Sequence, residues 1–309
     1  MKPRTNTVLM IEPVAFGYNE QTAVNNYFQR KEASTADSQS LALAEFREMV
    51  DKLTEKGVNV VVVPDTPMPH TPDSIFPNNW ISFHEDGRVA IYPMYAENRR
   101  QERRLDILET LKEKGFNVES VMDYTASERE NRFLEGTGSI ILDREHKIAY
   151  AAISERTDEK LFEQFCADFG YKAIPFHSYQ SVNGKRLAIY HTNVMMCLGD
   201  RFAVVCLDCI DDHKERTLVA KSLVDCGKEL IDITEEQMHH FAGNMLQIEN
   251  GNGKPLLVMS KTAYDSLAIH QVERLNSFSE IIAFNIPTIE QLGGGSVRCM
   301  MAELFLPKR

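Results

Sequence analysis

Residues 38–63 read SQSLALAEFREMVDKLTEKGVNVVVV, a helix, a glycine and a strand in succession. Apolar residues at three- and four-residue spacing, starting at Leu41, predict a helix over residues 38–56. Gly57 follows, and glycine is the usual residue where a helix ends in a left-handed conformation. The valine-rich residues 58–63 then predict a buried strand. This unit is the element from which the fold is built.

The same unit recurs four more times along the chain. Each recurrence predicts a helix followed by a strand: helix 99–114 with strand 116–122, helix 157–169 with strand 171–176, helix 214–226 with strand 229–233, and helix 260–275 with strand 280–284. The first four helices end at glycines spaced by 58, 55 and 57 residues, namely Gly57, Gly115, Gly170 and Gly227. A nearly constant period of this length is the signature of a repeat architecture.

Short polar clusters lie between these units, and each leads into an apolar strand. They occupy residues 77–81, 135–140, 191–195, 243–246 and 293–301. Each unit is expected to run strand, strand, helix, strand, and residues 7–12 to supply the strand that completes the ring. Five units closing on themselves would form an α/β propeller of five ββαβ blades with the clusters on its axis; an open α/β sheet is the alternative. No linker divides the chain, so residues 1–309 are expected to form a single domain.

The composition excludes several classes of protein. A net charge of −11 argues against nucleic-acid binding, which depends on neutralising phosphates with Lys and Arg. No apolar run reaches the roughly 20 residues of a membrane span, and the N-terminus lacks the apolar core of a signal peptide. Six cysteines in 309 residues do not make a dense disulfide framework. We therefore expect a cytoplasmic protein that binds neither nucleic acid nor membrane, and the sequence leaves a homo-oligomer open.

The last polar cluster carries a candidate nucleophile. Three glycines at 293–295 precede Cys299, and this loop is expected to bring an accessible thiol to the mouth of a strand. A buried core cysteine after a plain turn is the alternative. His191 and Glu135 lie in two other clusters, where an imidazole can move protons and a carboxylate can orient it. Singly, His191 could be a core histidine and Glu135 a turn cap, but the repeat brings all three together.

These residues resemble a known group of enzymes. Residues 133–136 (FLEG), 191–193 (HTN) and 293–299 (GGGSVRC) are similar to motifs of the pentein, or amidinotransferase-like, superfamily. That superfamily includes arginine deiminases, dimethylarginine hydrolases, arginine dihydrolases and glycine amidinotransferases. The resemblance runs from about Val8 to the end of the chain, and the three motifs together make it specific.

The resemblance implies a fivefold propeller and a catalytic site without metal or organic cofactor. It implies Cys299 as the attacking thiolate, His191 as general acid/base, and Glu135 as a ligand of the substrate nitrogens. It also implies contacts to the substrate from further polar residues, for which the candidates are Asp73, Asn78, Asn79, Asn193, Asn244, Asn25, Arg132 and Arg100 (or its neighbour Arg99). The arginines are candidates for the substrate carboxylate, with solvated surface positions as the alternative.

Two positions depart from the deiminase pattern. Deiminases place aspartates where this chain has Asn79 and Asn193. An amide both donates and accepts hydrogen bonds, whereas an ionised carboxylate only accepts them. A neutral ureido group therefore suits these positions better than a guanidinium does. At Asn79 the chain resembles the arginine dihydrolase branch, and overall it is most similar to the citrulline-utilisation hydrolase branch.

We therefore expect a cysteine hydrolase of C–N bonds, other than peptide bonds, in a small guanidino or ureido amino acid such as citrulline or arginine. Cys299 would form a covalent intermediate, and ammonia would be released. An amidinotransferase, which passes the amidino group to an amine, is one alternative. A non-enzymatic ribosome-binding module of the same fold is the other, and it would lack the Cys, His and Glu set.

A second cysteine motif points to different chemistry. Cys206 and Cys209 form a C-x-x-C pair, with His213 and Cys226 further along the chain. Such residues can hold zinc or act as a redox dithiol. The apolar run 202–205 instead predicts that Cys206 faces the core, so no metal is expected.

Overall fold

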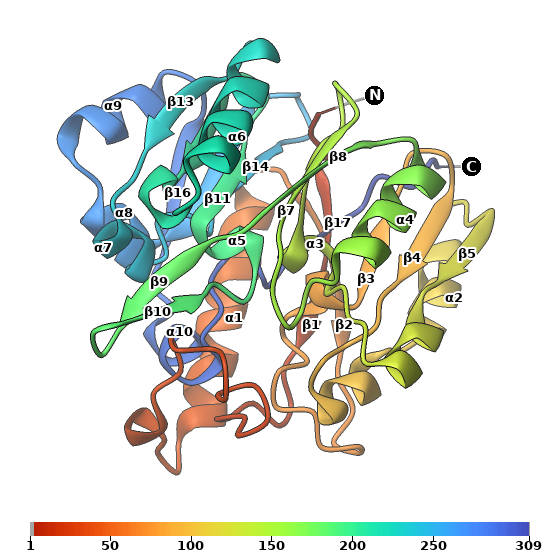
Figure 1. The fold of residues 1–309 in the computed structure, drawn as a ribbon. Coiled ribbons are helices and arrows are strands. Elements are labelled where there is room, and N and C mark those ends of the chain that lie inside the picture. The colour runs from red at the N-terminus through yellow and green to blue at the C-terminus, as the bar shows by residue number, and fades with distance from the viewer. Residues whose placement is uncertain (1–2, 309) are drawn as a thin grey trace.

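The computed structural model describes residues 3–308, whose strands form five three-stranded sheets and one hairpin (Figure 1). In each sheet the middle strand pairs antiparallel with one neighbour and parallel with the other. In strand order the sheets are β17 (Ala302–Glu303), β1 (Thr7–Glu12) and β2 (Asn59–Pro64); β3 (Ile81–Phe83), β4 (Arg88–Ile91) and β5 (Ser120–Asp123); β6 (Ile140–Asp143), β7 (Ile148–Ala152) and β8 (Lys172–Phe176); β11 (Met196–Leu198), β12 (Phe202–Val205) and β13 (Glu229–Asp232); and β14 (Leu246–Glu249), β15 (Pro255–Ser260) and β16 (Glu280–Phe284). The hairpin is β9 (Tyr179–Val182) with β10 (Lys185–Ala188).

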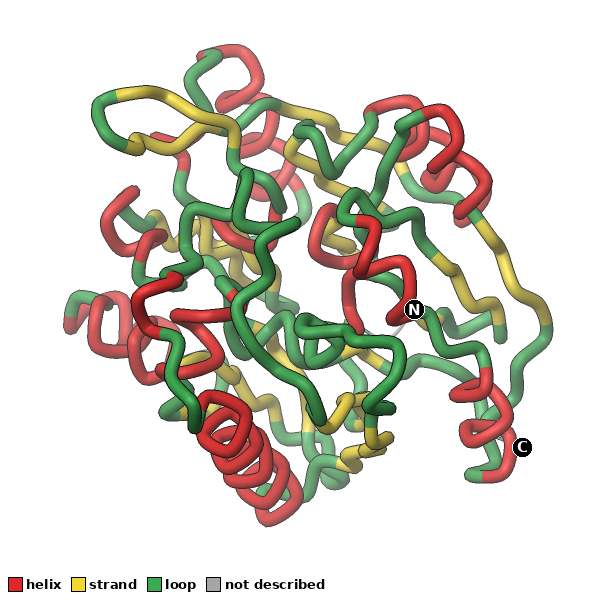
Figure 2. The backbone as a smooth tube through the Cα atoms, turned by 90° about the horizontal axis from the view of Figure 1, so that it is seen from below, coloured by secondary structure: helices red, strands yellow, loops and turns green. Residues whose placement is uncertain are grey.

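Helices connect the parallel strands of every sheet, because a parallel pair requires a crossover connection. The crossover helices are α1 (Ser38–Glu55), α2 (Asp106–Glu113), α4 (Glu159–Phe169), α6 (His213–Asp225) and the pair α8 (Lys261–Ser266) and α9 (Ile269–Asn276). The shorter helices are α3 (Gly136–Ser139), α5 (Thr192–Met195), α7 (Glu235–His239) and α10 (Pro287–Gly293). Figure 2 shows the crossover helices toward the rim of the molecule and loops toward its middle.

The repeat predicted from the sequence is confirmed. All four helix-ending glycines have a left-handed φ, between 71° and 85°: Gly57, Gly115, Gly170 and Gly227. Strands β1 and β16 have the predicted bounds. The α/β class is confirmed as well. The five sheets are not hydrogen-bonded to one another within residues 3–308, so they form no single closed sheet and the predicted propeller is not established by strand pairing.

Two predicted helices are broken in the structure. The helix expected over 99–114 is a 3₁₀ segment, Glu97–Glu102, followed by α2, because the Arg99 side chain turns inward and is only 2% exposed. The helix expected over 260–275 divides into α8 and α9, since Leu267 and Ala268 between them are extended. The crossovers stay in place, but each has a bend that the apolar spacing did not reveal.

The buried face of α1 also differs from the prediction. Leu41 is 49% exposed, whereas Ala42, Phe46, Met49 and Leu53 are buried. The helix therefore faces the core along a stripe that begins one residue later than expected. This stripe packs with Val8 and Met10 of β1 and with the apolar residues of α10.

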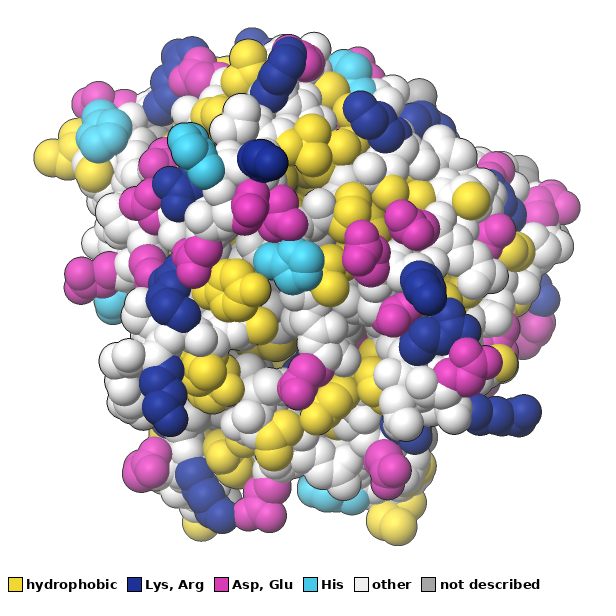
Figure 3. Space-filling view, in the orientation of Figure 1, with side chains coloured by type: hydrophobic (Ala, Val, Ile, Leu, Met, Phe, Trp, Pro, Cys, Tyr) yellow, Lys and Arg dark blue, Asp and Glu magenta, His cyan; other side chains and the backbone are white. Residues whose placement is uncertain are grey.

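Buried apolar side chains join neighbouring sheets into one body. The largest cluster includes Tyr150 of β7, Val204 of β12 and Leu257 of β15, so three sheets share one core. Acidic and basic side chains are intermixed over the face shown in Figure 3. No helix within residues 3–308 is long and apolar enough to cross a membrane.

The short polar segments meet in the middle of the molecule. Helix α3 lies against α5 and against the 3₁₀ turn Pro77–Asn79. Gly136 begins α3 with φ +48°, and a Cβ atom there would stand 2.2 Å from the backbone oxygen of Asn78. Only glycine permits so close an approach. Residues 13–37, red at the bottom of Figure 1, connect β1 to α1 and lie over this polar layer.

Candidate active site

A small cavity lies under residues 13–37, where the polar clusters converge. Its lining comes from the covering segment, from several polar clusters and from the triple-glycine loop: Thr22, Asn26, Asp73, Phe76, Asn79, Arg99, Arg156, Tyr190, His191, Gly293, Gly294, Gly295 and Cys299. Its free volume is only ≈ 10 Å³. That is about the space that one water molecule requires.

The Cys299 sulfur is held by two amides from different repeats. Asn193 Nδ2 donates to Sγ over 3.4 Å, and Asn244 Nδ2 donates to Sγ over 3.3 Å. Cys299 is only 5% exposed, so the expectation of an accessible thiol is wrong. The covering segment is the reason, because Asn26 Nδ2 donates to the Gly294 carbonyl over 3.2 Å and fastens the segment to the glycine loop.

Glu135 and His191 hold equivalent positions, immediately before α3 and α5. His191 Nε2 lies 2.7 Å from Glu135 Oε2, and Arg156 Nη1 lies 3.5 Å from the same oxygen. Burial lowers the pKa of His191 to about 4, although Glu135 opposes the change. Burial alone would raise the pKa of Glu135, but Arg156 and His191 hold it at about 2. The pair at neutral pH is therefore a carboxylate and a neutral imidazole that donates Nε2–H and keeps Nδ1 free.

The protein is expected to lose stability as the pH falls from about 6.5 toward 4, because His191 binds its proton at higher pH in the unfolded chain. The depressed pKa of folded His191 contributes fully above the unfolded value and is lost as the pH falls through the folded one. The contribution is on the order of 3 kcal/mol. Urea unfolding of the wild type and of His191→Gln across this window checks it. Equal pH dependence in both proteins would contradict the expectation.

Asp73 and Asn79 form the opposite wall of the cavity. Asp73 Oδ2 accepts from Asn19 Nδ2 at 2.7 Å and from Thr22 Oγ1 at 3.2 Å, and burial raises the pKa of Asp73 against the effect of Arg99. Arg99 Nη1 donates to Asn79 Oδ1 over 2.7 Å. This bond fixes the orientation of the Asn79 amide, and its Nδ2 is left without a hydrogen-bond partner among the described residues.

Besides the two amide atoms of Asn78, three buried polar atoms of this layer have no hydrogen-bond partner within residues 3–308. They are Asp73 Oδ1, Asn79 Nδ2 and Asn193 Oδ1. Two are acceptors and one is a donor. A Cβ atom at Gly138 would lie 2.4 Å from Asn79 Nδ2 and 2.9 Å from His191 Nδ1, so glycine keeps open the space that both nitrogens border. The layer therefore offers a small mixed set of donors and acceptors beside Cys299.

Other predicted residues lie outside the cavity. Arg100 interacts with the Met94 carbonyl at 3.0 Å and lies 3.6 Å from Glu128, while Arg132 pairs with Glu130 at 2.6 Å on the surface. Neither arginine lines the cavity, so neither remains a candidate for binding the substrate carboxylate. Asn25 acts indirectly, because its Oδ1 accepts from Arg156 Nε at 2.9 Å.

Four predicted residues lie in the polar layer but do not line the cavity: Glu135, Asn193, Asn78 and Asn244. Glu135 and Asn193 each bond a lining residue, His191 and Cys299 respectively. Asn78 is fully buried, and neither of its amide atoms has a partner in the described chain. Asn244 donates to the Cys299 sulfur but does not itself line the cavity. We therefore place Asn78 and Asn244 outside the substrate-contacting set, whereas Asn193, which bonds the lining residue Cys299, keeps an unpaired Oδ1.

The sequence analysis missed Arg156, which is 1% exposed and stacks 4.8 Å from the Tyr190 ring centroid. Its Nη2 donates to the Thr22 carbonyl over 2.8 Å, so it also fastens the covering segment. One signal could have found it. Arg156 lies between strand β7 and helix α4, close after the carboxyl end of the strand, where Arg99 stands after β4.

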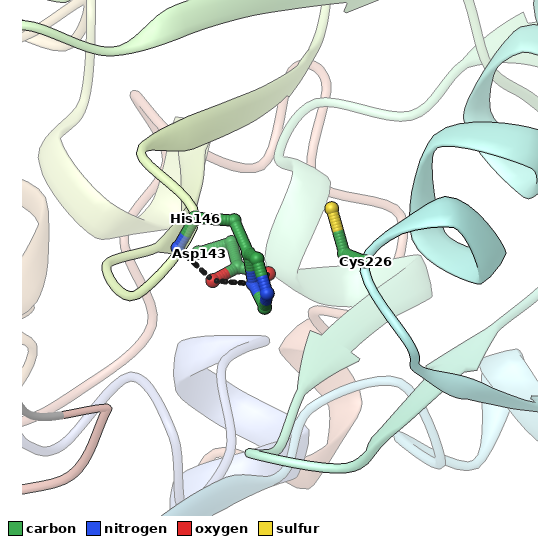
Figure 4. Close-up of side chains that lie close together, drawn as sticks. All are labelled: Asp143, His146 and Cys226. Carbon is green, nitrogen blue, oxygen red and sulfur yellow. Dashed lines mark hydrogen bonds and ion pairs between the residues drawn. The ribbon is translucent and has the colours of Figure 1, made fainter.

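One group in the described chain brings three metal-type ligands together, namely Asp143, His146 and Cys226, within 4.8 Å of one another (Figure 4). His146 Nδ1 lies 3.0 Å from Asp143 Oδ2, and the buried Lys228 Nζ lies 3.3 Å from the same oxygen. The ammonium group competes with any metal ion for this carboxylate. The Asp143 carboxylate is therefore already engaged by Lys228 and His146, and no member of the group lines the cavity.

The alternative zinc set of the sequence does not assemble. Cys206 and Cys209 are fully buried with their sulfurs 2.9 Å apart. Cys226 belongs instead to the group with Asp143. The prediction that Cys206 faces the core is confirmed.

A family model described as N,N dimethylarginine dimethylhydrolase, eukaryotic, matches residues 12–306. A sequence search among curated proteins found no significant match. Many solved structures are similar. ArgZ, an arginine dihydrolase from the ornithine–ammonia cycle in cyanobacteria, aligns over 98% of this chain and 41% of its own, with a TM-score of 0.74 and 15% identity.

Two further structures match over nearly their whole length. The N-terminal domain of ArgZ bound to substrate aligns over 97% of this chain and 99% of its own, with a TM-score of 0.71 and 16% identity. A dimethylarginine dimethylaminohydrolase in an adduct with S-methyl-L-thiocitrulline aligns over 97% of this chain and 100% of its own, with a TM-score of 0.66 and 15% identity. This chain thus spans about two-fifths of full-length ArgZ and shares the fold of its N-terminal domain.

Proposed function

The chain belongs to the family described as N,N dimethylarginine dimethylhydrolase, eukaryotic, within the pentein superfamily, and from this membership we propose that it is a cysteine hydrolase of guanidino or ureido C–N bonds. Cys299 is the nucleophile, since it is the only cysteine that lines the cavity in the described part of the chain. His191 is the general acid/base and Glu135 orients it. This role replaces the predicted contact of Glu135 with the substrate nitrogens, because its two carboxylate oxygens already accept from His191 and from the Tyr95 backbone N–H. ArgZ offers a precedent for covalent chemistry, because its N-terminal domain has been crystallised bound covalently to a reaction intermediate.

The proposed reaction has two steps. Neutral His191 takes the Cys299 proton through Nδ1, and the thiolate attacks the planar carbon. The carbon–sulfur bond forms, the bond to the terminal nitrogen breaks, and His191 returns the proton to the departing ammonia. His191 then activates a water molecule that displaces the sulfur. Glu135 keeps Nε2–H in place throughout and stabilises the imidazolium that forms in each step.

The mixed set of unpaired polar atoms is the observation that carries the choice of substrate. A guanidinium has only donors, so it can satisfy Asp73 Oδ1 and Asn193 Oδ1 but not the Asn79 Nδ2 donor. A ureido group has N–H donors and a carbonyl acceptor, and it can satisfy all three. Citrulline is therefore a substrate, either supplied as such or formed from arginine in a first hydrolysis. Hydrolysis of its ureido carbon gives ornithine, ammonia and carbon dioxide.

The substrate assay is expected to show citrulline turnover to ornithine, with two ammonia per arginine if arginine also enters. Arginine, citrulline and methylarginines are each supplied separately, and ammonia and the amino-acid product are counted. Stoichiometric citrulline from arginine, with citrulline itself inert, would contradict the proposal.

Asn79→Asp tests the donor directly, because it exchanges the unpaired Nδ2 for an acceptor and keeps the side-chain shape. Citrulline turnover is expected to fall about ten- to a hundredfold relative to arginine turnover. Asn78→Asp is the matched control, since Asn78 is the adjacent buried amide and does not line the cavity. An unchanged substrate ratio in Asn79→Asp would mean that Asn79 does not contact the reacting group.

Substrate entry requires the covering segment to move. A free volume of ≈ 10 Å³ is far smaller than an amino acid. Arg156 is the proposed partner of the substrate carboxylate, because its Nη1 has only the 3.5 Å ion pair with Glu135 among the described residues. Its other two nitrogens hold Asn25 and Thr22 of the covering segment. Binding of a carboxylate to Arg156 would therefore alter the hydrogen bonds that hold the covering segment.

The wider setting of this activity is also part of the proposal. The five sheets are the blades of a five-bladed propeller, and residues 1–309 form a single catalytic domain that works in the cytoplasm without a cofactor. Its partner is the small guanidino or ureido amino acid. Formation of a homo-oligomer is compatible with this proposal. The strand pattern common to the five sheets, and the apolar core that neighbouring sheets share, support the propeller arrangement.

A further inference from the structure

Asn244 is the one residue of the polar layer whose amide is fully engaged around the nucleophile. Its Nδ2 donates to Cys299 Sγ over 3.3 Å and to the Asn193 carbonyl over 3.0 Å. Its Oδ1 accepts the backbone N–H of Arg298 over 3.1 Å. Asn244 is 1% exposed. With both N–H groups and one lone pair used, no donor is left for a substrate, and the amide cannot rotate without losing all three bonds.

The backbone is built to deliver this amide. Gly243, the preceding residue, lies against α5 so closely that a Cβ atom would stand 2.3 Å from the Val194 carbonyl oxygen. Phe241 turns the chain with a left-handed φ of 63°. Asn244 thereby reaches the carbonyl of Asn193, whose own side chain donates to the same sulfur. Two amide donors thus converge on Sγ from two repeats and are tied to each other.

We propose that Asn244 is a positioning residue that, with Asn193, holds Cys299 Sγ and stabilises its thiolate form through two N–H donors. This inference rests on the proposed function, in which the thiolate attacks. Hydrogen bonds to a charged acceptor are roughly twice as strong as those to a neutral one. The same two bonds therefore favour the ionised sulfur over the thiol. They also hold the sulfur of Cys299 in place at the cavity that this residue lines.

This assignment replaces the prediction that Asn244 binds the substrate. It also gives different roles to the side-chain amides of Asn193 and Asn244. Asn193 has an unpaired Oδ1 and can meet both the sulfur and the substrate, whereas Asn244 can only meet the sulfur. Loss of Asn244 should therefore lower kcat with little change in KM.

The decisive experiment follows ionisation of the sulfur without any substrate. The ultraviolet absorbance of the thiolate is titrated against pH, and the Cys299→Ala curve is subtracted so that only Cys299 contributes. Asn244→Leu, which loses both donors, is expected to move the midpoint to higher pH by about one unit. Asn244→Asp has the same shape but places a carboxylate beside the sulfur, so it should move the midpoint further in the same direction.

Asn78→Leu is the control, because it removes a buried amide of the same layer that makes no contact with sulfur, and its midpoint should match the wild type. Circular dichroism reports whether each variant folds, and Asn244→Ala, which removes both donors without adding a charge, decides the question if the Leu variant does not fold. A wild-type midpoint in a folded Asn244 variant would overturn the inference. Because the titration uses no substrate, its result is independent of whether the protein hydrolyses citrulline or arginine.

Discussion

Cys299→Ala is expected to reduce turnover by about a thousandfold or more while leaving the fold intact. The covalent step requires a nucleophile at this point of the cavity. The fold is expected to survive because the substitution removes one sulfur atom and two N–H contacts to it. Ammonia release measures the first effect, and urea unfolding measures the second.

Cys166→Ala is the matched control for this variant. Cys166 is also a buried cysteine, 2% exposed, but it lies in α4 and does not line the cavity. Both variants leave a small space in a packed region, so both are expected to lose some stability, whereas only Cys299→Ala is expected to lose turnover. Near-normal ammonia release from Cys299→Ala would mean that the thiol is structural and that the proposed mechanism fails.

The repeat could be predicted because it is carried by local signals. A helix-ending glycine and a β-branched run depend only on nearby residues, and each of the four glycines adopts the expected left-handed conformation. Glu135, His191 and Cys299 could be predicted for a related reason, since each occupies a recurring polar cluster that leads into an apolar strand. The structure brings His191 and Cys299 to one cavity, with Glu135 bonded to His191.

Exposure could not be predicted because it depends on residues distant in the chain. The glycine loop was expected to present Cys299 to solvent, but residues 13–37 fold over it. Asn26 of that segment is bonded to a carbonyl more than 260 positions away. No sequence pattern near Cys299 predicts this contact. The same holds for the stripe of α1, where Leu41 faces solvent because its neighbours are packed against α10.

The choice between two adjacent arginines also lay beyond the sequence. Arg99 and Arg100 have the same chemistry, and the charged run around them is typical of a solvated helix. In the structure Arg99 is 2% exposed and enters the cavity wall, whereas the Arg100 side chain is 26% exposed. The deciding partner is Glu102, itself buried, which lies three residues further along the same 3₁₀ segment.

Arg99→Met is expected to destabilise the protein by about 3–5 kcal/mol, because it removes one partner of a buried ion pair. Arg99 Nε donates to Glu102 Oε1 over 2.9 Å, and Nη2 donates to Glu102 Oε2 over 2.8 Å. Burial raises the pKa of Glu102 to about 8 even beside Arg99. Without Arg99 the carboxyl group would take up a proton and stay buried with both of these hydrogen bonds lost. Urea unfolding measures the loss. Arg100→Met is the matched control. The Arg100 side chain is 26% exposed and its ion pairs with Glu97 and Glu128 are long, at 4.0 Å and 3.6 Å, so their loss is expected to cost about 1 kcal/mol or less.

A double variant separates the cost of leaving Glu102 buried without its partner from the net value of the pair. Replacing a buried ion pair by apolar residues is often nearly neutral, so Arg99→Met combined with Glu102→Leu should recover much of the lost stability. Turnover should stay low in the double variant, because the bond from Arg99 to Asn79 Oδ1 is gone and the Asn79 amide is free to rotate. Recovered stability with recovered citrulline turnover would show that Arg99 does not orient Asn79. Wild-type stability of Arg99→Met alone would show that Glu102 does not need its partner.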